Sequence, residues 1–290
     1  MSNQSDHLMT PDPAVQASFR DLMDIGTGTE TCLRQTIEQV LAHPGSLVRA
    51  QLAYRMQRAH GVCEEHALSV ATAIEYFHTA SLIFDDMPAM DNATERRGSP
   101  CAHVVFGEAT ATLAALAFIN RGYGLLWQVI ATLPDLARLE ASRLVTTCLG
   151  VQGILNGHSR DLEFQASARG EAEVLEVAEG KTVTLIRLTL LLPAIVAGVS
   201  AADRAALEDL STRWGLAYQI MDDFKDGLMT REETGKTSAR DAQLHHPNLA
   251  VAIGRDAAWL RLCGLMDEAR ALVRTLVTGD TAWSVLNQLQ

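Results

Sequence analysis

The sequence predicts an all-α fold. Apolar residues recur mostly at the spacing of an amphipathic helix, and no sustained alternation of apolar and polar residues bounded by turn signals predicts a strand. One series shows the helical spacing: Leu136, Leu139, Leu144, Cys148, Val151 and Leu155. With 290 residues, of which 48% are hydrophobic and 20% charged, the chain has the composition of a soluble globular protein with a large core.

The eight prolines stand almost entirely at the joints between predicted helices. Two lie near the N-terminus, and the joints between helical patterns contain Pro44, Pro88, Pro100, Pro134 and Pro247. Pro193 is the exception, because it lies inside the apolar run LTLLLPAIVAGV, where it should kink a buried helix. That run is shorter than the roughly 20 apolar residues that span a bilayer, so we expect no integral membrane segment.

Residues 14–290 are predicted to form one helical domain. No Gly/Ser-rich linker, internal repeat or low-complexity block divides residues 14–288. Residues 1–13, MSNQSDHLMTPDP, lack the basic start and apolar core of a signal peptide, so we expect a disordered tail. The five cysteines are odd in number and share no C-x-x-C spacing, which argues against a disulfide framework and a zinc site. We therefore expect a cytoplasmic protein.

The chain carries a formal net charge of −11. This charge disfavours nucleic acid as a partner, because phosphate backbones are bound by basic surfaces. It is compatible with a small phosphorylated ligand that is held through metal ions.

A first group of carboxylates ends an apolar helical stretch, in SLIFDDMPAMD, residues 81–91. On a continuous helix Asp91 would lie about 240° around the axis from Asp85, on a different face. Pro88 should end or break the helix near Asp86, so the turn MPAM can carry Asp91 back toward the first pair. Such a group is commonly a solvated helix end, and the alternative is that a bound cation screens its charges.

A second group follows the apolar stretch WGLAYQIM, in YQIMDDFKD, residues 218–226. Asp222 and Asp226 are four residues apart and lie on one helical face, with Asp223 beside them. Two opposed sets of carboxylate oxygens are the ligands that a hard divalent cation such as magnesium selects. The second group therefore favours a metal site between facing helices over two unrelated helix ends.

Basic side chains accompany both acidic groups. Arg96 and Arg97 follow the first group in ERRGSP, and Lys181 and Lys236 lie in two GKT tripeptides. A P-loop would need glycine at positions 175 and 230, where the chain has leucine and threonine, so these lysines are isolated cations. Each one taken singly is more often a surface charge than a ligand.

His78 precedes Asp85 by seven residues, which is two helical turns. It should therefore point to the same side, about 10 Å deeper. A lone histidine on an apolar helix is usually a core residue, whereas its alignment with the aspartates favours a role in the site. The sequence leaves both interpretations open.

Several segments together resemble the trans-prenyltransferases, the isoprenyl diphosphate synthases. They are HTASLIFDDMPAMD with ERRGSP, then FGEATATLAA, EGKTVTLIR, YQIMDDFKD and TGKTSARD, in order between about residues 43 and 254. The resemblance implies a bundle of about ten or more helices around a central cavity, the isoprenoid synthase type I fold. It also implies a homodimer.

In that family the two acidic motifs, here DDxxxxD and DDxxD, hold three magnesium ions that grip an allylic diphosphate. The resemblance implies ionisation to an allylic cation and pyrophosphate, attack by the double bond of isopentenyl diphosphate, and loss of a proton. Metal ions and Arg or Lys charges stabilise such a leaving group, and an apolar cavity protects the cation from water. The implied product is a short-chain diphosphate, farnesyl or geranylgeranyl.

The resemblance also assigns roles to residues at matching positions. The implied metal ligands are Asp85, Asp86, Asp91, Asp222, Asp223 and Asp226. The implied contacts of the allylic diphosphate are Arg96, Lys181 and Lys236, and the oxygens facing the cation are those of Thr182 and Gln219. The implied site for isopentenyl diphosphate contains Arg49, Arg97 and His78. Bulky side chains five residues before the first motif limit the product, so Ala80 implies a product near twenty carbons.

One segment departs from the family pattern. Family members usually carry G-K-R-x-R-P, whose Lys and first Arg hold much of the isopentenyl diphosphate, and this chain reads GSLVRA at residues 45–50. Gly45 and Arg49 remain, but Ser46 and Leu47 replace the two cations. Each charge-assisted contact contributes about 1.5–3 kcal/mol, so we expect weaker binding of isopentenyl diphosphate.

A second departure is that the usual Gly-Gln pair becomes Gly157-His158, followed by Asp161. Three interpretations follow from the motifs and these departures. The first is a prenyl diphosphate synthase. The second is a terpene synthase of the same fold, which ionises and cyclises a prenyl diphosphate without isopentenyl diphosphate. The third is a non-catalytic partner subunit of an active synthase, against which the six intact aspartates argue.

Overall fold

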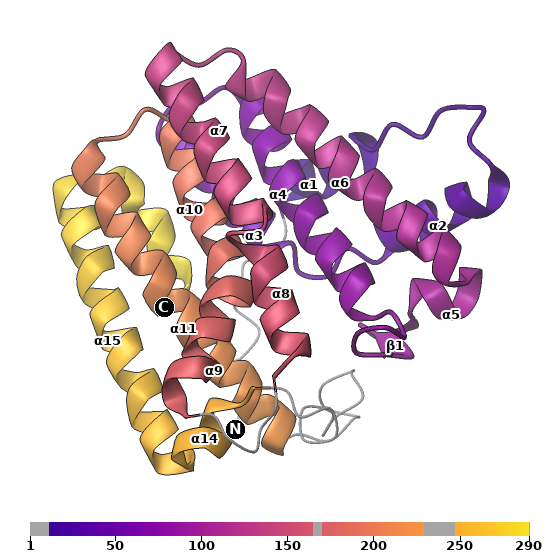
Figure 1. Ribbon diagram of the computed structural model, residues 1–290. Coiled ribbons are helices and arrows are strands. Elements are labelled where there is room, and N and C mark those ends of the chain that lie inside the picture. The colour runs from indigo at the N-terminus through magenta and orange to yellow at the C-terminus, as the bar shows by residue number, and fades with distance from the viewer. Residues whose placement is uncertain (1–11, 165–169, 229–246, 290) are drawn as a thin grey trace, which may run out of the picture.

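Helix α4 (Glu64–Asp85) lies at the centre of the bundle and packs against four other helices, α1, α3, α6 and α10 (Figure 1). The computed structural model describes residues 12–164, 170–228 and 247–289. In those residues the only strands are the antiparallel pair β1 (Glu95–Arg96) and β2 (Ser99–Pro100). The predicted all-α fold is confirmed.

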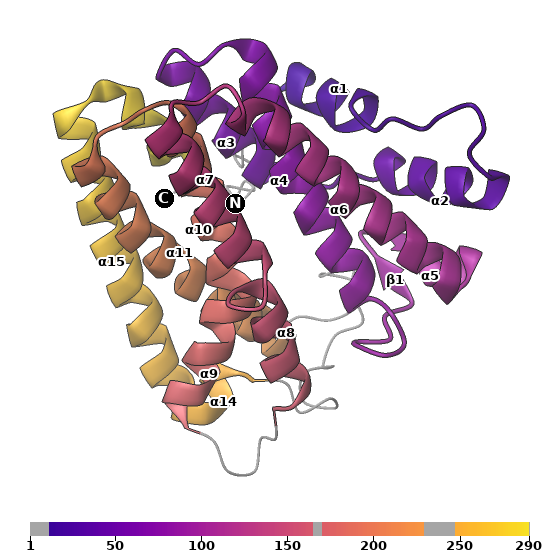
Figure 2. The ribbon, with the colours of Figure 1, turned by 45° about the horizontal axis from the view of Figure 1, so that its top comes forward.

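The remaining elements follow one another through mostly short connections. The N-terminal half supplies α1 (Pro13–Asp21), α2 (Thr31–Ala42), α3 (Val48–Ala59), α5 (Ala102–Phe106) and α6 (Glu108–Ile130). The rest of the chain supplies α7 (Asp135–Leu149), α8 (Ile154–Leu162), α9 (Glu171–Ala178), the π-helical turn η1 (Glu179–Val183), α10 (Thr184–Val196), α11 (Ala201–Leu228), α14 (Leu249–Ile253), α15 (Arg255–Gly279) and the 3-10 helix η2 (Thr281–Leu289). Helices α1 and α2 pack on α4 and α6, and α15 packs on α11 at the opposite side (Figures 1 and 2).

The central position of α4 follows from its nearly continuous apolar sequence. Tyr76 is fully buried, and its ring makes edge-to-face contacts with Phe19 of α1 and Phe118 of α6. Its hydroxyl donates a hydrogen bond to the carbonyl of Phe19 at 2.8 Å, so the buried polar atom is satisfied. Gly122 lets α6 approach α4 closely, because a Cβ there would lie 2.9 Å from the ring of Phe77. This packing fixes the direction in which the end of α4 presents its aspartates.

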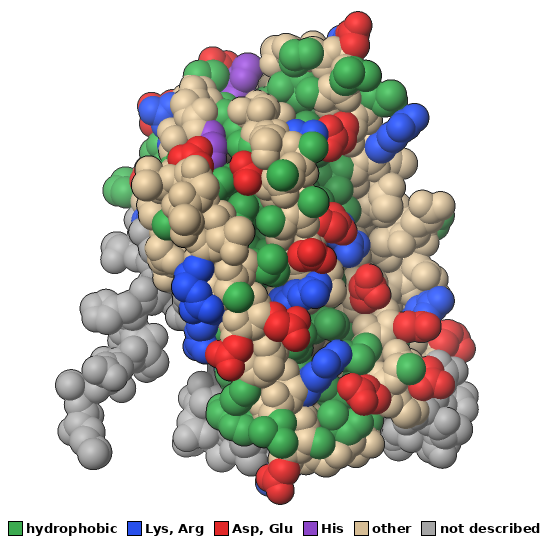
Figure 3. All heavy atoms as spheres, turned by 90° about the vertical axis from the view of Figure 1, so that its left-hand side faces the viewer, with side chains coloured by type: hydrophobic (Ala, Val, Ile, Leu, Met, Phe, Trp, Pro, Cys, Tyr) green, Lys and Arg blue, Asp and Glu red, His purple; other side chains and the backbone are tan. Residues whose placement is uncertain are grey.

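A second apolar cluster joins α10, α11 and α15 around the fully buried Trp283 of η2. Figure 3 shows the outer face on this side, where acidic and basic side chains are interspersed. Arg213 of α11 and Glu268 of α15 form one such pair, with Nε and Oε2 3.2 Å apart. Because exposed pairs contribute little to stability, the buried apolar cluster is what holds α15 against α11.

The prolines lie where the sequence predicts them. The joints contain Pro44 before α3, Pro88 after α4, Pro100 in β2, Pro134 at the start of α7 and Pro247 before α14. Pro193 lies buried inside α10, as predicted. Helix α1 begins at Pro13, and the side chain of Asp12 caps it by accepting a hydrogen bond from the amide of Ala14 at 2.9 Å.

Among the residues that the structure describes, two helices, α4 and α6, are long and apolar enough to cross a membrane by length and composition. In the apolar window of α4, 72% of the residues are buried inside the fold, and in that of α6 the share is 44%. Burial among neighbouring helices accounts for the apolar character of α4.

Candidate active site

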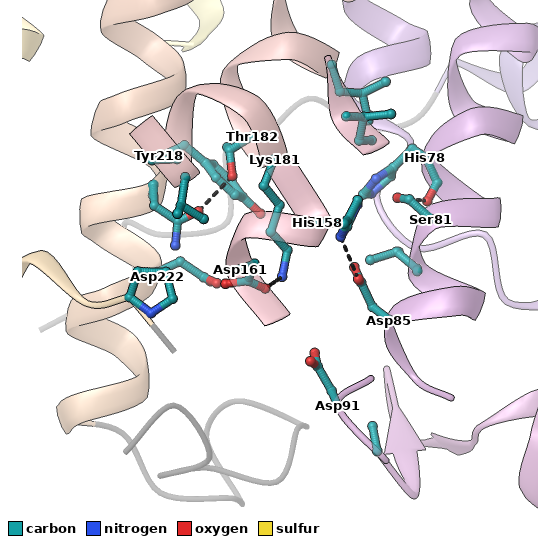
Figure 4. A pocket seen from close by; sticks show the side chains of 18 of the residues that line it. His78, Ser81, Asp85, Asp91, His158, Asp161, Lys181, Thr182, Tyr218 and Asp222 are labelled. Carbon is teal, nitrogen blue, oxygen red and sulfur yellow. Dashed lines mark hydrogen bonds and ion pairs between the residues drawn. The ribbon is translucent and has the colours of Figure 1, made fainter. Parts of the chain in front are cut away.

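A cavity of about 210 Å³ lies between the C-terminal half of α4, helix α8, the turn η1 and the C-terminal half of α11. Its charged lining consists of Asp85, Asp91, Glu95, Asp161, Asp222, Arg49, Arg96 and Lys181. Figure 4 shows Asp85 and Asp91 on the α4 side, Asp222 on the α11 side, and Lys181 between them. The two acidic motifs therefore face one cavity, as predicted.

The turn after α4 brings the first motif together. The helix ends at Asp85, and the amide of Asp91 donates to the carbonyl of Asp85 at 2.8 Å. The amide of Ala93 likewise donates to the carbonyl of Asp86 at 3.1 Å. Pro88 stands in this turn and ends the helix, so Asp91 returns beside Asp85 and both line the cavity.

Asp86, the second aspartate of the motif, does not line this cavity. It pairs with Arg96 instead. Nε of Arg96 lies 2.8 Å from both oxygens of Asp86, and Nη2 lies 2.6 Å from Oδ1. The side chain of Asp86 is 8% exposed and that of Arg96 is 19% exposed, so solvent screens this pair weakly. Arg96 lines the cavity and is anchored there by a motif carboxylate.

Helix α8 is held against the turn η1 by two glycines. A Cβ on Gly157 would collide with the backbone of Gly180 and Lys181, so the close approach requires glycine at position 157. This contact places two side chains of α8 in the site. Nζ of Lys181 lies 2.6 Å from Oδ2 of Asp161, and Nδ1 of His158 lies 3.2 Å from Oδ1 of Asp85.

The charges in this part of the cavity control each other's ionisation. Burial opposes the charged form of Asp85, but the charge of Lys181 and the contact with His158 outweigh it, so the pKa of Asp85 lies below its usual value. Burial likewise opposes the charged form of Lys181, but Asp85, Asp161 and Asp91 outweigh it and raise the pKa of this lysine. The site therefore holds an ionised aspartate and a charged lysine at neutral pH.

The second motif is held by a chain of hydrogen bonds from η1 to α14. The hydroxyl of Thr182 donates to Oε1 of Gln219 at 2.7 Å, and Nε2 of Gln219 donates to Oδ1 of Asp223 at 2.9 Å. Oδ2 of Asp223 accepts from the amide of Leu249 at 2.7 Å. Asp223 is buried by these contacts, and Asp222 is the neighbour that lines the cavity.

The donors in the cavity fit a hard divalent cation. Asp85 and Asp91 on one wall and Asp222 on the other offer carboxylate oxygens, which magnesium prefers. Within the described ranges, no three His, Cys, Asp or Glu side chains are already gathered as one metal cluster. A cation would therefore need a further anionic ligand, such as a phosphate oxygen, to join the two walls.

Two of the residues predicted for the second substrate, Arg49 of α3 and His78 of α4, lie together beside Tyr218 of α11. Nη1 of Arg49 lies 3.3 Å from Nε2 of His78, and its guanidinium lies 5.7 Å from the centre of the Tyr218 ring. All three line the cavity, which supports a site role for His78. Buried Glu75 accepts a hydrogen bond from the amide of Ala50 at 3.2 Å.

Glu75 also acts electrostatically on the two arginines of this region. Burial raises the pKa of Glu75, and the charges of Arg49 and Arg97 oppose that effect without cancelling it. Arg97 lines a smaller neighbouring cavity instead of the main one. Its Nη1 donates a hydrogen bond to the carbonyl of His43 at 3.4 Å.

Segment 45–50 differs from the expectation in one respect. Leu47 was expected to stand where a substrate-facing arginine is usual, but its side chain is 1% exposed and packs in the main core. Its backbone has φ of 51°, and this left-handed turn directs the side chain inward at the start of α3. Ser46 is exposed, so it is the replaced position that can reach a ligand.

Ala80, the predicted chain-length position, is 1% exposed and packs in the core. Its neighbours Ser81 and Leu82 line the cavity instead. A role for Ala80 in limiting the chain length of the product stays a prediction, since at this point of α4 it is Ser81 that lines the cavity.

The structure brings most of the predicted residues together. The main cavity is lined by Asp85, Asp91, Asp222, Arg96, Lys181, Thr182, Gln219, Arg49 and His78. The remaining predictions include Lys236 and the side chain of Asp226, which lie outside the described residues. His158, Asp161 and Tyr218 also line the cavity, although no sequence motif assigned them a site role. The spacing of His158 and Asp161 after Gly157 was the available signal.

Comparison with known proteins agrees with this geometry. The polyprenyl synthetase family model matches residues 30–258. The geranylgeranyl diphosphate synthase of Pseudescherichia vulneris is 37% identical over 202 residues, which cover 70% of this chain and 64% of the relative. The farnesyl diphosphate synthase of Geobacillus stearothermophilus is 31% identical over 210 residues, which cover 72% and 71%.

The match therefore spans just under two thirds of the length of the first of these relatives. A solved structure of geranyltransferase from Helicobacter pylori, complexed with magnesium and isoprenyl diphosphate, shares the fold with a TM-score of 0.82. It is 24% identical and covers 100% of this chain and 99% of its own. The extent of the family match and the shared motifs show that the chain belongs to the polyprenyl synthetase family.

Proposed function

We propose that this protein is a magnesium-dependent prenyltransferase that condenses an allylic diphosphate with isopentenyl diphosphate to farnesyl or geranylgeranyl diphosphate. The observation that carries the proposal is the position of Asp85 and Asp91 opposite Asp222, with Lys181 between the two walls. The relatives named for geranylgeranyl and farnesyl diphosphate synthesis support the same conclusion.

The metal would be held by Asp85 and Asp91 on one wall and by Asp222 on the other, joined by diphosphate oxygens. When bound, magnesium neutralises charge on the leaving pyrophosphate. Lys181 and Arg96 bind the same diphosphate from the protein side, and the raised pKa of Lys181 keeps it charged. These contacts strengthen as negative charge develops on the leaving group.

The chain also protects and stabilises the allylic cation. The hydroxyl of Thr182 donates a hydrogen bond to Oε1 of Gln219, so the lone pairs of the hydroxyl oxygen remain available to face the positive charge. Apolar side chains next to the charged region line the cavity and keep water away from the cation: Leu82, Ile154, Val174, Val177, Ala178 and Leu185. The new carbon–carbon bond then forms from the double bond of isopentenyl diphosphate, and a proton is lost.

Arg49, His78 and Arg97 are proposed to bind isopentenyl diphosphate. Arg49 and His78 line the main cavity, and Arg97 packs over Gly45 and lines the smaller neighbouring cavity. This site lacks the lysine that is usual at position 46, and the buried carboxyl group of Glu75 lies close to the arginines. Binding of the second substrate should therefore be weak and strongly reduced by salt.

We also propose that the protein is cytoplasmic and forms a homodimer. Exposed apolar side chains on α5 and α6 offer a face for a second copy: Val104, Val105, Leu113, Leu116 and Trp127. Sedimentation velocity tests the dimer directly.

One assay separates the proposed activity from its alternatives. The purified protein is incubated with magnesium and geranyl, farnesyl or geranylgeranyl diphosphate, with and without isopentenyl diphosphate, and products are identified by mass spectrometry. An elongated diphosphate is the expected result. A hydrocarbon formed without isopentenyl diphosphate would instead identify a terpene synthase, and the absence of any product would favour a non-catalytic subunit.

A further inference from the structure

His158 contacts a motif aspartate from a helix that the motifs do not include. Its ring lines the cavity, and Nδ1 lies 3.2 Å from Oδ1 of Asp85 (Figure 4). Both atoms are buried, and within the described part of the chain neither has a partner that meets hydrogen-bond angles. The 3.2 Å approach of the imidazole is therefore the polar contact that Oδ1 of Asp85 makes, and a small rotation of the ring would turn it into a hydrogen bond.

The backbone that carries His158 is fixed in place. Its neighbour Gly157 packs directly on the backbone of η1 at Gly180, where any side chain would collide. Asp161, one turn further along α8, holds Nζ of Lys181 at 2.6 Å. Helix α8 thus provides a separate partner for each charged group: Asp161 pairs with Lys181, and His158 contacts Asp85.

A carboxylate that binds a metal through one oxygen is commonly oriented by a hydrogen bond to the other. Without such a partner the side chain of Asp85 could turn toward Lys181, whose positive charge already acts on it. An Nδ1–H donor from His158 prevents this turn and leaves Oδ2 to face the cavity. The chain has histidine where Gln is usual in the motif, and both side chains can donate this hydrogen bond.

We infer that His158 is a positioning residue that orients Asp85 for magnesium. The inference rests on the proposed function, because it requires Asp85 to be a metal ligand. It predicts that loss of the imidazole donor weakens magnesium binding, whereas an amide donor at the same position preserves it.

The test measures magnesium binding without turnover. Melting temperatures are recorded while magnesium chloride is titrated at a fixed concentration of inorganic pyrophosphate, for the wild type and for H158L, H158F and H158Q. The variants H158L and H158F should need roughly 10–100-fold more magnesium for half of the stabilisation. H158Q should stay close to the wild type. Asn156→Leu, which makes the same kind of change at an exposed position of α8, should have no effect.

Two outcomes would overturn the inference. If H158L and H158F fold and bind magnesium like the wild type while Asp85→Ala does not, His158 has no positioning role and the proposed function stands. If Asp85→Ala itself leaves magnesium binding unchanged, Asp85 is no ligand, and the inference and the proposed metal site fail together. Should H158L fail to fold, H158F retains a ring of similar volume and carries the test.

The wild type offers a second measurement that needs no variant. In protein labelled with ¹⁵N-histidine, the tautomer of His158 should be the one protonated at Nδ1, since that atom faces the carboxylate. A neutral ring protonated at Nε2 in the magnesium–pyrophosphate complex would contradict the inference.

Discussion

Arg96 donates from Nε to both carboxylate oxygens of Asp86 at 2.8 Å, and this pair joins the short hairpin β1–β2 to the end of α4. The arginine that should contact the allylic diphosphate is therefore fixed by a motif carboxylate before any ligand is present. This arrangement orients Arg96 toward the cavity and balances one charge of an acidic motif.

Replacing Arg96 by alanine should destabilise the fold as well as impair activity. The variant leaves Asp86 buried without its cation, which should lower the free energy of unfolding by about 3 kcal/mol. Urea denaturation of R96A, of D86A and of the double variant measures the coupling. A double variant that loses the sum of the two single effects would show that the pair is unimportant for stability.

Glu75 should weaken the second-substrate site and cost stability at neutral pH. Its pKa is raised in the folded protein, so the folded state binds more protons than the unfolded state. Stability should therefore fall as pH rises from about 4.3, the ordinary value for glutamate, to the folded pKa, and should then be level.

Glu75→Gln keeps an oxygen for the amide of Ala50 but has no group that can ionise. This variant should be more stable than the wild type at pH 7, should lose that pH dependence, and should bind isopentenyl diphosphate roughly tenfold more tightly, a change of about 1.4 kcal/mol. Denaturation at several pH values and steady-state kinetics provide the measurements. Lower stability at pH 7 together with a higher KM would mean that the arginines depend on the ionised carboxylate.

Restoring a cation at position 46 and restoring one at position 47 should have different effects. Ser46 is exposed and follows Gly45, over which Arg97 packs, so Ser46→Lys should lower the KM for isopentenyl diphosphate about fivefold if the new contact contributes about 1 kcal/mol. Leu47 is 1% exposed, so Leu47→Arg should cost at least about 3 kcal/mol of stability. An unchanged KM in a folded Ser46→Lys variant would show that another cation already serves the site.

Product length should be controlled from position 81 more directly than from position 80. Ser81 lines the cavity, so Ser81→Phe should fill it and shorten the product, as judged by mass spectrometry of the diphosphates. Ala80 packs in the core, so Ala80→Phe should instead overpack α4 and cost about 1–3 kcal/mol of stability. If Ala80→Phe is as stable as the wild type and shortens the product, while Ser81→Phe does not, the wall lies at Ala80.

The sequence predicted the helical class, the helix breaks and the first motif because these depend on local rules. Pro88 has to end α4, and the return of Asp91 to the carbonyl of Asp85 follows from that break. The inward direction of Leu47 depends on a left-handed turn and on the helices around it, which no local pattern reports.

The sequence showed the spacing of His158 and Asp161 after Gly157 but not the contacts that these two side chains make. His158 and Asp161 reach the cavity because Gly157 meets Gly180 across two elements. Such a contact between distant glycines has no periodic signature, so the ion pairs that His158 and Asp161 make in the site were identified from the structure.

The most direct test of the opposed acidic walls is turnover of Asp85→Ala and Asp222→Ala with geranyl or farnesyl diphosphate and isopentenyl diphosphate at saturating magnesium. Each substitution removes a proposed metal ligand from one wall of the cavity, and in the proposed mechanism both walls hold the leaving pyrophosphate in the transition state. We expect each variant to lose several orders of magnitude in kcat and the wild type to be inactive in excess chelator. Near-normal turnover of either variant, or full activity of the wild type with the chelator, would contradict the proposed site.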